Sequence, residues 1–322
     1  MAGAGGLDAT VAICTRNRAR ALRRLLASLA GMHVEPGREW EVVVADNAST
    51  DDTTAAARAF AGTLPLKLTG VATPGLSHAR NACLDAARGR LVIFVDDDAT
   101  VGPRWLETYL DAMRRYPEAA YFGSDIEPVF EGEGNPWKDL LLELAPNAYA
   151  AFEVGPADVP QDAASRTLKP PFGANIAFVA DRLAGRRFDA GLGRRPGRAV
   201  LSGEETQLVF DLLEAGGHGV LVAGNPVRHW IEPARQTPHF VSRYFEGLGR
   251  LSGEPATRAP GGREPLRYWR RKAERALFPL WAPFMPRRQA LERMIEIGAY
   301  IGACDRIGAG DPPMRRPTRG EP

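Results

Sequence analysis

The feature that most constrains the fold is an unbroken apolar stretch, Leu91 to Val95, that ends directly in Asp96, Asp97 and Asp98. Five consecutive aliphatic and aromatic residues are typical of a strand that is buried on both faces of a sheet. The aspartates would lie at the carboxyl end of that strand, which is where open α/β sheets bind their ligands. Three neighbouring carboxylates are costly unless a cation accompanies them. The stretch therefore predicts a ligand site that contains a cation, with a solvated turn as the alternative.

The segments around this strand alternate between strand-like and helix-like patterns. We expect further strands at residues 10–15, 40–45, 64–68, 119–123, 172–179 and 220–223. We expect helices at residues 22–29, 51–60, 76–88, 103–113, 137–144 and 202–214. This alternation predicts an α/β fold with a doubly wound, mostly parallel sheet flanked by helices. The remainder of residues 125–170 is interpreted as a variable loop on the substrate side.

The charge of the chain is uneven. The net charge is +2 over 322 residues, but the part from Arg258 onward holds 14 Lys and Arg against 7 Asp and Glu. A basic end favours a membrane surface or a partner over nucleic acid, because no pattern of basic and aromatic residues for a nucleic-acid groove accompanies it. An apolar stripe that includes Leu266, Trp269 and Leu280 would suit a helix on an anionic membrane. Packing of this stripe on the rest of the chain is the alternative.

The start of the chain and its cysteines indicate a compartment. The first ten residues carry neither the basic nor the apolar region of a signal peptide. The longest apolar piece, residues 276–285, contains two prolines and is too short to cross a membrane. Cys14, Cys83 and Cys304 lie far apart in the sequence without zinc-binding spacing, which favours reduced core residues. We expect a cytoplasmic protein, with the inner face of the membrane as a further possibility.

A second expected strand also ends in an acid, Asp46. Right-handed connections bring the carboxyl ends of parallel strands to one edge, so Asp46 and the three aspartates would share a site. A single carboxylate suits a base or a ribose, and a cluster suits a divalent cation bound through carboxylates and phosphates. The sequence has no glycine-rich phosphate loop, so an arginine would have to help hold phosphate. Arg80, near the start of an expected helix, is the candidate, and a surface arginine is the alternative.

Further polar residues have both a chemical and a structural interpretation. Glu204 and Glu205 would suit a general base at the start of a helix. Ser202 and Glu205 also have the spacing of a capping box, and spacing does not choose between the two glutamates. His229 follows a strand and is either a ligand or a core histidine. Asn175, between apolar neighbours, is either a hydrogen-bonding residue of the sheet or a contact to an acceptor.

Seven short stretches, taken together and in order, resemble the family-two glycosyltransferases. They are Thr15-Arg-Asn-Arg18, Val44-Ala-Asp-Asn-Ala-Ser-Thr-Asp51, Gly75-Leu-Ser-His-Ala-Arg-Asn81, Phe94-Val-Asp-Asp-Asp98, Gly173-Ala-Asn-Ile-Ala-Phe178, Gly203-Glu-Glu-Thr206 and Val227-Arg-His229. The resemblance covers roughly residues 8–250 and implies the GT-A fold of nucleotide-diphospho-sugar transferases. We expect a basic helical extension at residues 251–310 and a disordered tail at residues 311–322.

The resemblance implies roles for the donor-side residues. Thr15 and Asp46 would contact the nucleobase, usually uracil. Arg80 would lie against the base or the diphosphate. Asp97 would reach the ribose, and Asp96 would hold the turn on the same nucleotide-sugar side.

The resemblance also implies a metal and acceptor contacts. Asp98 would bind Mg²⁺ or Mn²⁺ that bridges the diphosphate, with His229 as a possible further contact. Asn175 and Trp230 would face the acceptor.

The implied reaction is an inverting single displacement. Glu205 stands where the family commonly has an aspartate base, and Glu204 is the alternative. The donor would be a nucleotide-diphosphate sugar, UDP-linked, and the acceptor a saccharide or lipid-linked hydroxyl in bacterial cell-surface polysaccharide, glycolipid or glycan synthesis. A sugar-nucleotide nucleotidyltransferase is an alternative, although it would normally show a glycine-rich loop after the first strand. A non-catalytic sugar-nucleotide-binding protein is another, although it would have less reason to keep these acids.

Overall fold

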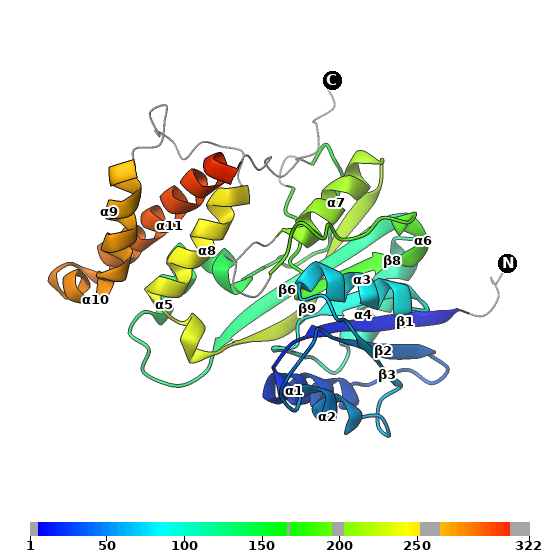
Figure 1. The fold of residues 1–322 in the computed structure, drawn as a ribbon. Coiled ribbons are helices and arrows are strands. Elements are labelled where there is room, and N and C mark those ends of the chain that lie inside the picture. Colours follow the sequence, from blue (N-terminus) through cyan, green and yellow to red (C-terminus); the bar gives the residue numbers. More distant parts are fainter. Residues whose placement is uncertain (1–5, 166–167, 195–202, 252–264, 310–322) are drawn as a thin grey trace.

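The structure is a computed structural model that describes residues 6–165, 168–194, 203–251 and 265–309 (Figure 1). Within these ranges a nine-stranded sheet has the order β3-β2-β1-β4-β8-β6-β9-β5, and β7 pairs with β9 beside that path. The strands are β1 (Leu7–Thr15), β2 (Trp40–Asp46), β3 (Leu66–Gly70), β4 (Gly89–Val95), β5 (Ala99–Val101), β6 (Ala119–Phe130), β7 (Val159–Gln161), β8 (Asn175–Val179) and β9 (His218–Ile231). The α-helices are α1 (Ala19–Ala30), α2 (Thr53–Arg58), α3 (Leu76–Ala86), α4 (Trp105–Arg115), α5 (Lys138–Leu144), α6 (Ala180–Leu183), α7 (Glu204–Glu214), α8 (Pro238–Leu251), α9 (Pro265–Ala276), α10 (Phe278–Trp281) and α11 (Arg287–Ala309). The expected α/β sheet flanked by helices is confirmed.

The first half of the sheet is parallel. β1 pairs with β2 and β4, and β2 pairs with β3, in each case in parallel. β1, β2 and β4 carry the aliphatic runs that a strand needs when helices cover both of its faces. Thr15 pairs with Asp46 at the ends of β1 and β2. The segment that follows each of these strands therefore leaves from the same edge of the sheet.

The second half of the sheet is mixed, because β8 runs antiparallel to both of its neighbours, β4 and β6. β6 and β9 are 12 and 14 residues long, much longer than the strands expected at residues 119–123 and 220–223. They pair in parallel and continue, after a register shift near Ser124, as far as Phe130 and Ile231. Polar residues and prolines in the second halves of both strands hide the strand pattern in the sequence.

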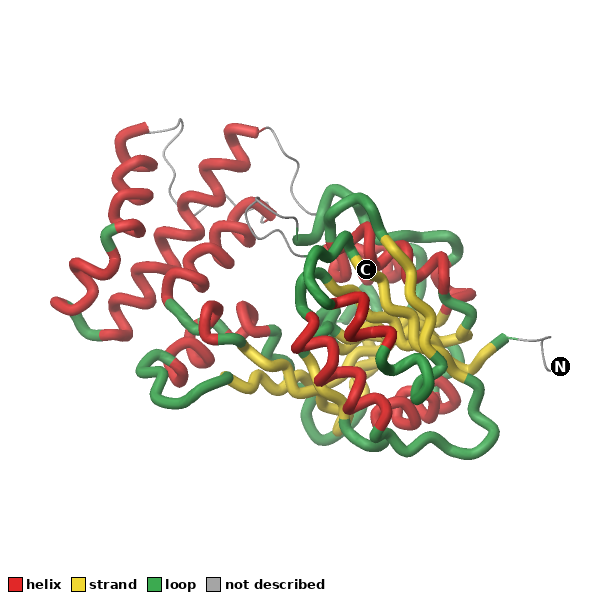
Figure 2. Tube along the Cα trace, turned by 60° about the horizontal axis from the view of Figure 1, so that its bottom comes forward, coloured by secondary structure: helices red, strands yellow, loops and turns green. Residues whose placement is uncertain are grey.

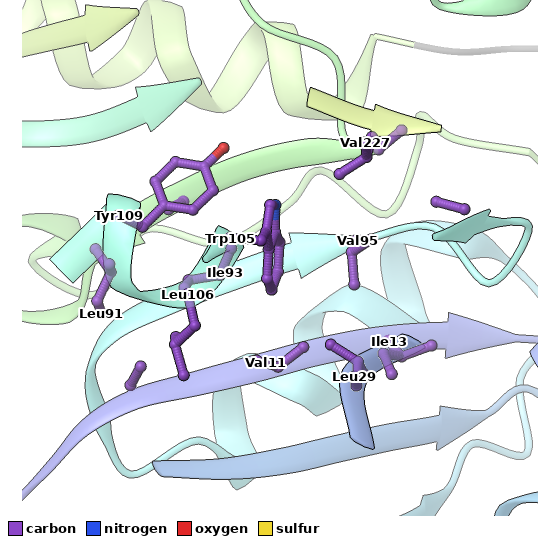
Figure 3. Close-up of a cluster of buried hydrophobic side chains, with 14 of the residues drawn as sticks. Val11, Ile13, Leu29, Leu91, Ile93, Val95, Trp105, Leu106, Tyr109 and Val227 are labelled. Atoms are coloured by element: carbon purple, nitrogen blue, oxygen red, sulfur yellow. The ribbon is translucent and has the colours of Figure 1, made fainter. Parts of the chain in front are cut away.

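Helices cover the two faces of the sheet according to the pleat of the strands. Val11 and Ile13 of β1 face one hydrophobic core, whereas Ala12 faces the other. Leucines of α1 and the large side chains of α4, among them Trp105 and Tyr109, fill the first core (Figure 3). Apolar residues of α3 and α7 fill the second core. α1 and α4 thus hold one face of the sheet, and α3 and α7 hold the other.

The C-terminal helices form a layer of their own. α8, α9, α10 and α11 gather at one end of the molecule, beside the sheet (Figures 1 and 2). α11 crosses α8 at very short range, since a Cβ atom at Gly298 would lie 1.9 Å from the backbone oxygen of Ser242, and one at Gly302 would lie 1.9 Å from that of Glu246. The division of the chain at residue 250 stays a prediction, and the tail at residues 311–322 lies outside the described residues.

None of the helices within the described ranges is long and apolar enough to span a lipid bilayer. Cys14, Cys83 and Cys304 are free thiols. The first two, although distant in sequence, lie with their sulfur atoms 4.0 Å apart between β1 and α3.

Candidate active site

A cavity of about 800 Å³ opens at the carboxyl ends of β1 and β4. Its walls come from the ends of these two strands, the first turns of α3 and α7, the loop segments around residues 147–152 and 168–174, and α8. The loop between β6 and β8 therefore borders this cavity, in line with its interpretation as a substrate-side loop. Side chains that are far apart in the sequence meet here.

Arg80 of α3 joins the two glutamates. Its side chain is buried, and Nη1 donates to Glu204 Oε1 at 2.5 Å and to Glu205 Oε2 at 3.3 Å. Nη2 lies 3.9 Å from Asp96 Oδ1. Both glutamates occupy the first turn of α7, where the helix dipole favours negative charge. The interpretation of Arg80 as a surface arginine is therefore wrong, because its guanidinium lies between the two groups of acids.

The two glutamates have different surroundings. Burial raises the pKa of Glu204 to about 7, repulsion from Glu205 adds to this effect, and the attraction of Arg80 opposes it. Glu204 Oε2 has no hydrogen-bond partner within the described parts of the chain. Glu205 Oε1 accepts one long hydrogen bond, 3.4 Å, from the backbone nitrogen of Gly173. Ser202, the other half of the expected capping box, lies outside the described residues.

Asp96 and Asp97 are arranged differently although they are neighbours. Asp96 lines the cavity and its side chain is 37% exposed. Asp97 is buried, and its Oδ1 lies 3.2 Å from Arg18 Nη1. Burial raises the pKa of Asp97 to about 7, and repulsion from Asp98 adds to the rise while Arg18 opposes it. Arg18 therefore offsets only part of the cost of burying this carboxyl group.

Asp98 is surrounded by groups that favour its charged form. Oδ2 accepts hydrogen bonds from Arg18 Nη1 at 2.5 Å and from Arg235 Nη1 at 3.0 Å. Oδ1 lies 3.3 Å from His229 Nε2. Burial acts against the carboxylate, but His229 in its protonated form and the two arginines outweigh it and hold the pKa of Asp98 well below its ordinary value. The cost of placing three carboxylates side by side, expected from the sequence, is thus offset in large part by guanidinium groups.

The two expected metal ligands, Asp98 and His229, lie next to each other. The carbonyl oxygen of Tyr149 can only accept a hydrogen bond, so His229 Nδ1, 2.8 Å away, carries the proton. In the neutral ring, Nε2 then directs a lone pair towards Asp98, an arrangement that suits a metal ligand. Within the described parts of the chain, however, no group of three His, Cys, Asp or Glu side chains is placed to hold a metal ion. Arg235 Nη1 also lies only 3.3 Å from the same Nε2.

Thr15 and Asp46, the two expected nucleobase contacts, differ in position. Thr15 lines the cavity, whereas Asp46 is not among its lining residues. The carboxylate of Asp46 accepts hydrogen bonds from the backbone nitrogen of Ser49 at 3.0 Å and from Thr54 Oγ1 at 2.5 Å. It therefore shapes the turn after β2, and its contact with a nucleobase stays a prediction.

Asn175 does not face the cavity, contrary to the expectation that it contacts the acceptor. It is fully buried, and its Oδ1 accepts hydrogen bonds from Trp105 Nε1 at 3.0 Å and Tyr109 OH at 2.8 Å. Its Nδ2 donates to two backbone carbonyl oxygens. All of its hydrogen-bonding groups are thus used inside the protein, which corresponds to the alternative interpretation as a residue of the sheet.

Trp230 also lies away from the cavity lining, so its expected acceptor contact is not supported. Its Nε1 donates to Thr100 Oγ1 at 3.1 Å. The guanidinium of Arg24 covers its ring at 4.4 Å. The side chain therefore joins β9 to β5 and α1. Side chains alternate along a strand, so Trp230 cannot share the orientation of its neighbour His229.

Sequence reasoning missed Arg235 and Tyr244, both of which line the cavity. Arg235 follows His229 by six positions, at the end of a short 3₁₀ turn, Pro233–Arg235. Tyr244 lies on α8. A basic residue shortly after a strand that ends in a candidate ligand was the available signal for Arg235, whereas no sequence pattern marked Tyr244.

The chain matches one protein-family model, over a region that begins in β1 and ends in the loop before β7. Residues 10–156 match the model of glycosyl transferase family 2. The succinoglycan biosynthesis protein ExoM of Rhizobium meliloti is 34% identical over 119 residues, which is 36% of this chain. The match spans only 38% of the length of ExoM.

Solved structures match nearly the whole chain. TarS 1-349 of Staphylococcus aureus in complex with UDP has a TM-score of 0.57 at 18% identity, over 95% of this chain and 92% of that chain. The mannosyltransferase PcManGT from Pyrobaculum calidifontis in complex with GDP-Man and Mn²⁺ has a TM-score of 0.52 at 18% identity, over 92% and 88% of the two chains. At these identities the likeness shows the fold, which is the GT-A fold.

Proposed function

Through residues 10–156 the chain belongs to glycosyl transferase family 2, and on that premise we propose that it transfers a sugar from a nucleotide-diphosphate donor to a hydroxyl acceptor with inversion. We propose UDP as the nucleotide, a choice supported by the UDP bound to TarS. We propose an acceptor in cell-surface polysaccharide, glycolipid or glycan synthesis, which the description of ExoM as a succinoglycan biosynthesis protein supports.

The observation that carries the proposal is the meeting of two acid groups in one cavity. Asp96, Asp97 and Asp98 lie at the end of β4, and Glu204 and Glu205 lie at the start of α7. Transfer with inversion requires a site that receives a charged leaving group and, on the opposite side of the sugar, a base for the acceptor. The two acid groups and the buried arginines beside them supply both requirements.

The proposed reaction needs one proton transfer. The base takes the proton of the acceptor hydroxyl as its oxygen attacks the anomeric carbon, and the bond from that carbon to the diphosphate breaks. We assign the base to Glu205, whose side chain is more exposed to the cavity than that of Glu204, 9% against 2%. Arg80 then positions the pair. Glu204, whose pKa of about 7 also suits a base, is the alternative.

We propose a divalent cation, Mg²⁺ or Mn²⁺, at Asp98 and His229. The lone pair of His229 Nε2 and the carboxylate of Asp98 supply two suitable donors. When bound, such an ion would offset the charge that develops on the departing nucleoside diphosphate. The Mn²⁺ in the structure of PcManGT supports this assignment.

We further propose that α9, α10 and the turn after them contact an anionic membrane. Among the described residues, five of the six exposed large apolar side chains lie between residues 266 and 284. Leu266 and Phe284 are each 88% exposed, and Trp269 is 65% exposed. Arg270 and Arg287 are also exposed on this segment. Apolar side chains beside positive charge match the boundary between headgroups and acyl chains of an anionic bilayer.

Two arginines of α9 do not belong to that surface. Arg271 is buried beside Glu274, and Arg275 binds Glu246 of α8.

Co-sedimentation with vesicles tests the proposed membrane-contact surface. The wild type should sediment with vesicles rich in phosphatidylglycerol and not with pure phosphatidylcholine, and Trp269→Ser with Leu280→Ser should weaken sedimentation at least 5-fold. Equal sedimentation of wild type and double variant would exclude this surface as the contact.

A nucleotide-sugar screen tests the proposed activity. Thermal unfolding of the full chain would be followed with UDP-, GDP- and dTDP-sugars, with and without Mn²⁺, and hits would be assayed for release of the nucleoside diphosphate. We expect UDP-sugars to raise the unfolding temperature and to support turnover. Asp98→Ala should lose this turnover, and Asp181→Ala, an exposed aspartate of α6, is the matched control. If no nucleotide sugar stabilises the wild type, the proposed function is wrong.

A further inference from the structure

Arg235 is a buried arginine whose hydrogen-bonding capacity is only partly used. It is 5% exposed, and it lines the cavity. Nη1 donates to Asp98 Oδ2 at 3.0 Å, whereas Nε and Nη2 have no hydrogen-bond partner among the described residues. A buried donor without a partner costs free energy, and the cost is larger for a charged group. Such an arginine at the wall of a cavity indicates an anionic ligand.

The same guanidinium lies against the two acceptor groups, the carboxylate of Asp98 and Nε2 of His229, that a divalent cation would need as ligands. Nδ1 of His229 donates to the carbonyl oxygen of Tyr149, so in the neutral form of the ring it is Nε2 that carries the lone pair. This lone pair and the carboxylate of Asp98 are both acceptors and lie 3.3 Å apart, so a positive donor is needed between them. Arg235 Nη1, 3.3 Å from Nε2 and 3.0 Å from Asp98 Oδ2, supplies it.

The surroundings of Arg235 favour this position of its guanidinium. The guanidinium carbon of Arg235, Cζ, lies 5.3 Å from the centre of the Phe240 ring. The backbone oxygen of Arg235 accepts a hydrogen bond from Tyr149 OH at 3.2 Å. Burial lowers the pKa of Arg235 to about 10, with Arg194 adding to the effect, so the side chain remains charged at neutral pH. A charged group in this pocket must therefore be balanced by Asp98 or by a ligand.

We propose that the positively charged guanidinium of Arg235 has two roles in the donor site. It prevents a free divalent ion from binding Asp98 and His229, and it binds a diphosphate oxygen of the donor through Nε and Nη2. The inference rests on the proposed function, because it takes the anion to be the nucleoside diphosphate. It goes further in stating an order of events. The diphosphate binds without metal, and a divalent ion enters the site only with the diphosphate, when Arg235 has turned towards the phosphate.

Binding of the two probes to the full chain tests the proposal. Affinity for Mn²⁺ alone would be measured by electron paramagnetic resonance, and affinity for UDP and for GDP by calorimetry in EDTA. The variants are Arg235→Gln and Arg235→Lys. The matched control is Arg228→Gln, because Arg228 lies on β9 but its side chain is 65% exposed. Thermal unfolding confirms that each variant is folded, and Arg235→Lys keeps the charge if Arg235→Gln does not fold.

We expect Arg235→Gln to bind Mn²⁺ at least about 10-fold more tightly than the wild type, because a competing charged hydrogen-bond donor is removed. The same variant should bind the nucleoside diphosphate in EDTA at least about 10-fold more weakly. Arg235→Lys should keep the weak Mn²⁺ affinity and lose affinity for the diphosphate, because it retains the charge but not the planar fork. Arg228→Gln should match the wild type in both measurements.

The outcomes separate this proposal from the proposed function. If the wild type binds UDP or GDP only when Mn²⁺ is present, the proposed function stands and the role of Arg235 is refuted. The role is also refuted if either the Mn²⁺ affinity or the diphosphate affinity is unchanged in both Arg235 variants. If neither nucleotide binds the wild type under any condition, the proposed function fails and the role of Arg235 fails with it.

Discussion

We predict that Glu204→Gln makes the stability of the protein less dependent on pH. Glu204 is 2% exposed, and burial raises its pKa to about 7, against an ordinary value of 4.5. An acid whose pKa is raised by folding takes up a proton when the chain folds. Its contribution to the free energy of unfolding is fully present below pH 4.5 and is lost as the pH rises through about 7. Glutamine has nearly the shape of the protonated acid and does not titrate.

The magnitude follows from the difference between the two pKa values. A difference of about 2.5 corresponds to roughly 3 kcal/mol in the free energy of unfolding. Most of this change falls between pH 5 and pH 8.5. Relative to the wild type, the free energy of unfolding of Glu204→Gln should therefore rise by roughly 2–3 kcal/mol over that interval.

Urea unfolding, followed by tryptophan fluorescence at half-unit steps from pH 5 to pH 8.5, measures this difference. Glu118→Gln is the matched control, because the side chain of Glu118 is 78% exposed and that of its ion-pair partner Arg182 is 47% exposed. Its curve should run parallel to that of the wild type. A parallel curve for Glu204→Gln would refute the reasoning, because it would mean that the attraction of Arg80 outweighs burial and keeps Glu204 ionised throughout.

Three further substitutions test particular contacts of the site. Asn175→Ala should lower the free energy of unfolding by about 3 kcal/mol or more, since it leaves Trp105 Nε1 and other buried groups without partners; an unchanged urea midpoint would contradict this. Gly173→Ala should reduce turnover at least about 10-fold, since the new Cβ would lie 1.9 Å from Arg80 Nη2 and must displace that guanidinium; an unchanged kcat would show that Arg80 needs no fixed position. Glu205→Gln should reduce kcat at least about 100-fold and leave the dissociation constant of the donor unchanged; loss of kcat in Glu204→Gln instead would exchange the two roles.

The strand ends were predictable because they depend on local patterns. The apolar run from Leu91 to Val95 could only be a buried strand, and the aspartates after it had to lie at the carboxyl end of that strand. The same reasoning placed Thr15 at the end of β1. Which acid would be solvated and which buried was not predictable, since exposure depends on segments that fold over the site from elsewhere. Asp96 is half-buried, and Asp98 is enclosed by residues of β9 and the turn after it.

Residues near strands were harder to interpret. Asn175 opens β8, and the sequence could not tell whether its amide points into the cavity or towards α4. The answer depends on Trp105 and Tyr109 of α4, which donate hydrogen bonds to the amide oxygen of Asn175. Trp230 was misplaced for a simpler reason. It neighbours His229 on a strand, and neighbouring side chains of a strand point to opposite faces.

The sequence by itself determined the strand and helix pattern of the first half of the sheet, the edge at which a ligand would bind, and the acids that lie there. Only the tertiary structure decided the partners of those acids. Arg80 meets Glu204 across 124 positions of the chain, and Arg235 meets Asp98 across 137. Periodicity and spacing in a sequence reflect interactions between residues only a few positions apart. These ion pairs instead depend on the order of strands in the sheet and on the antiparallel direction of β8. The balance of charge in the cavity is therefore a property of the folded chain.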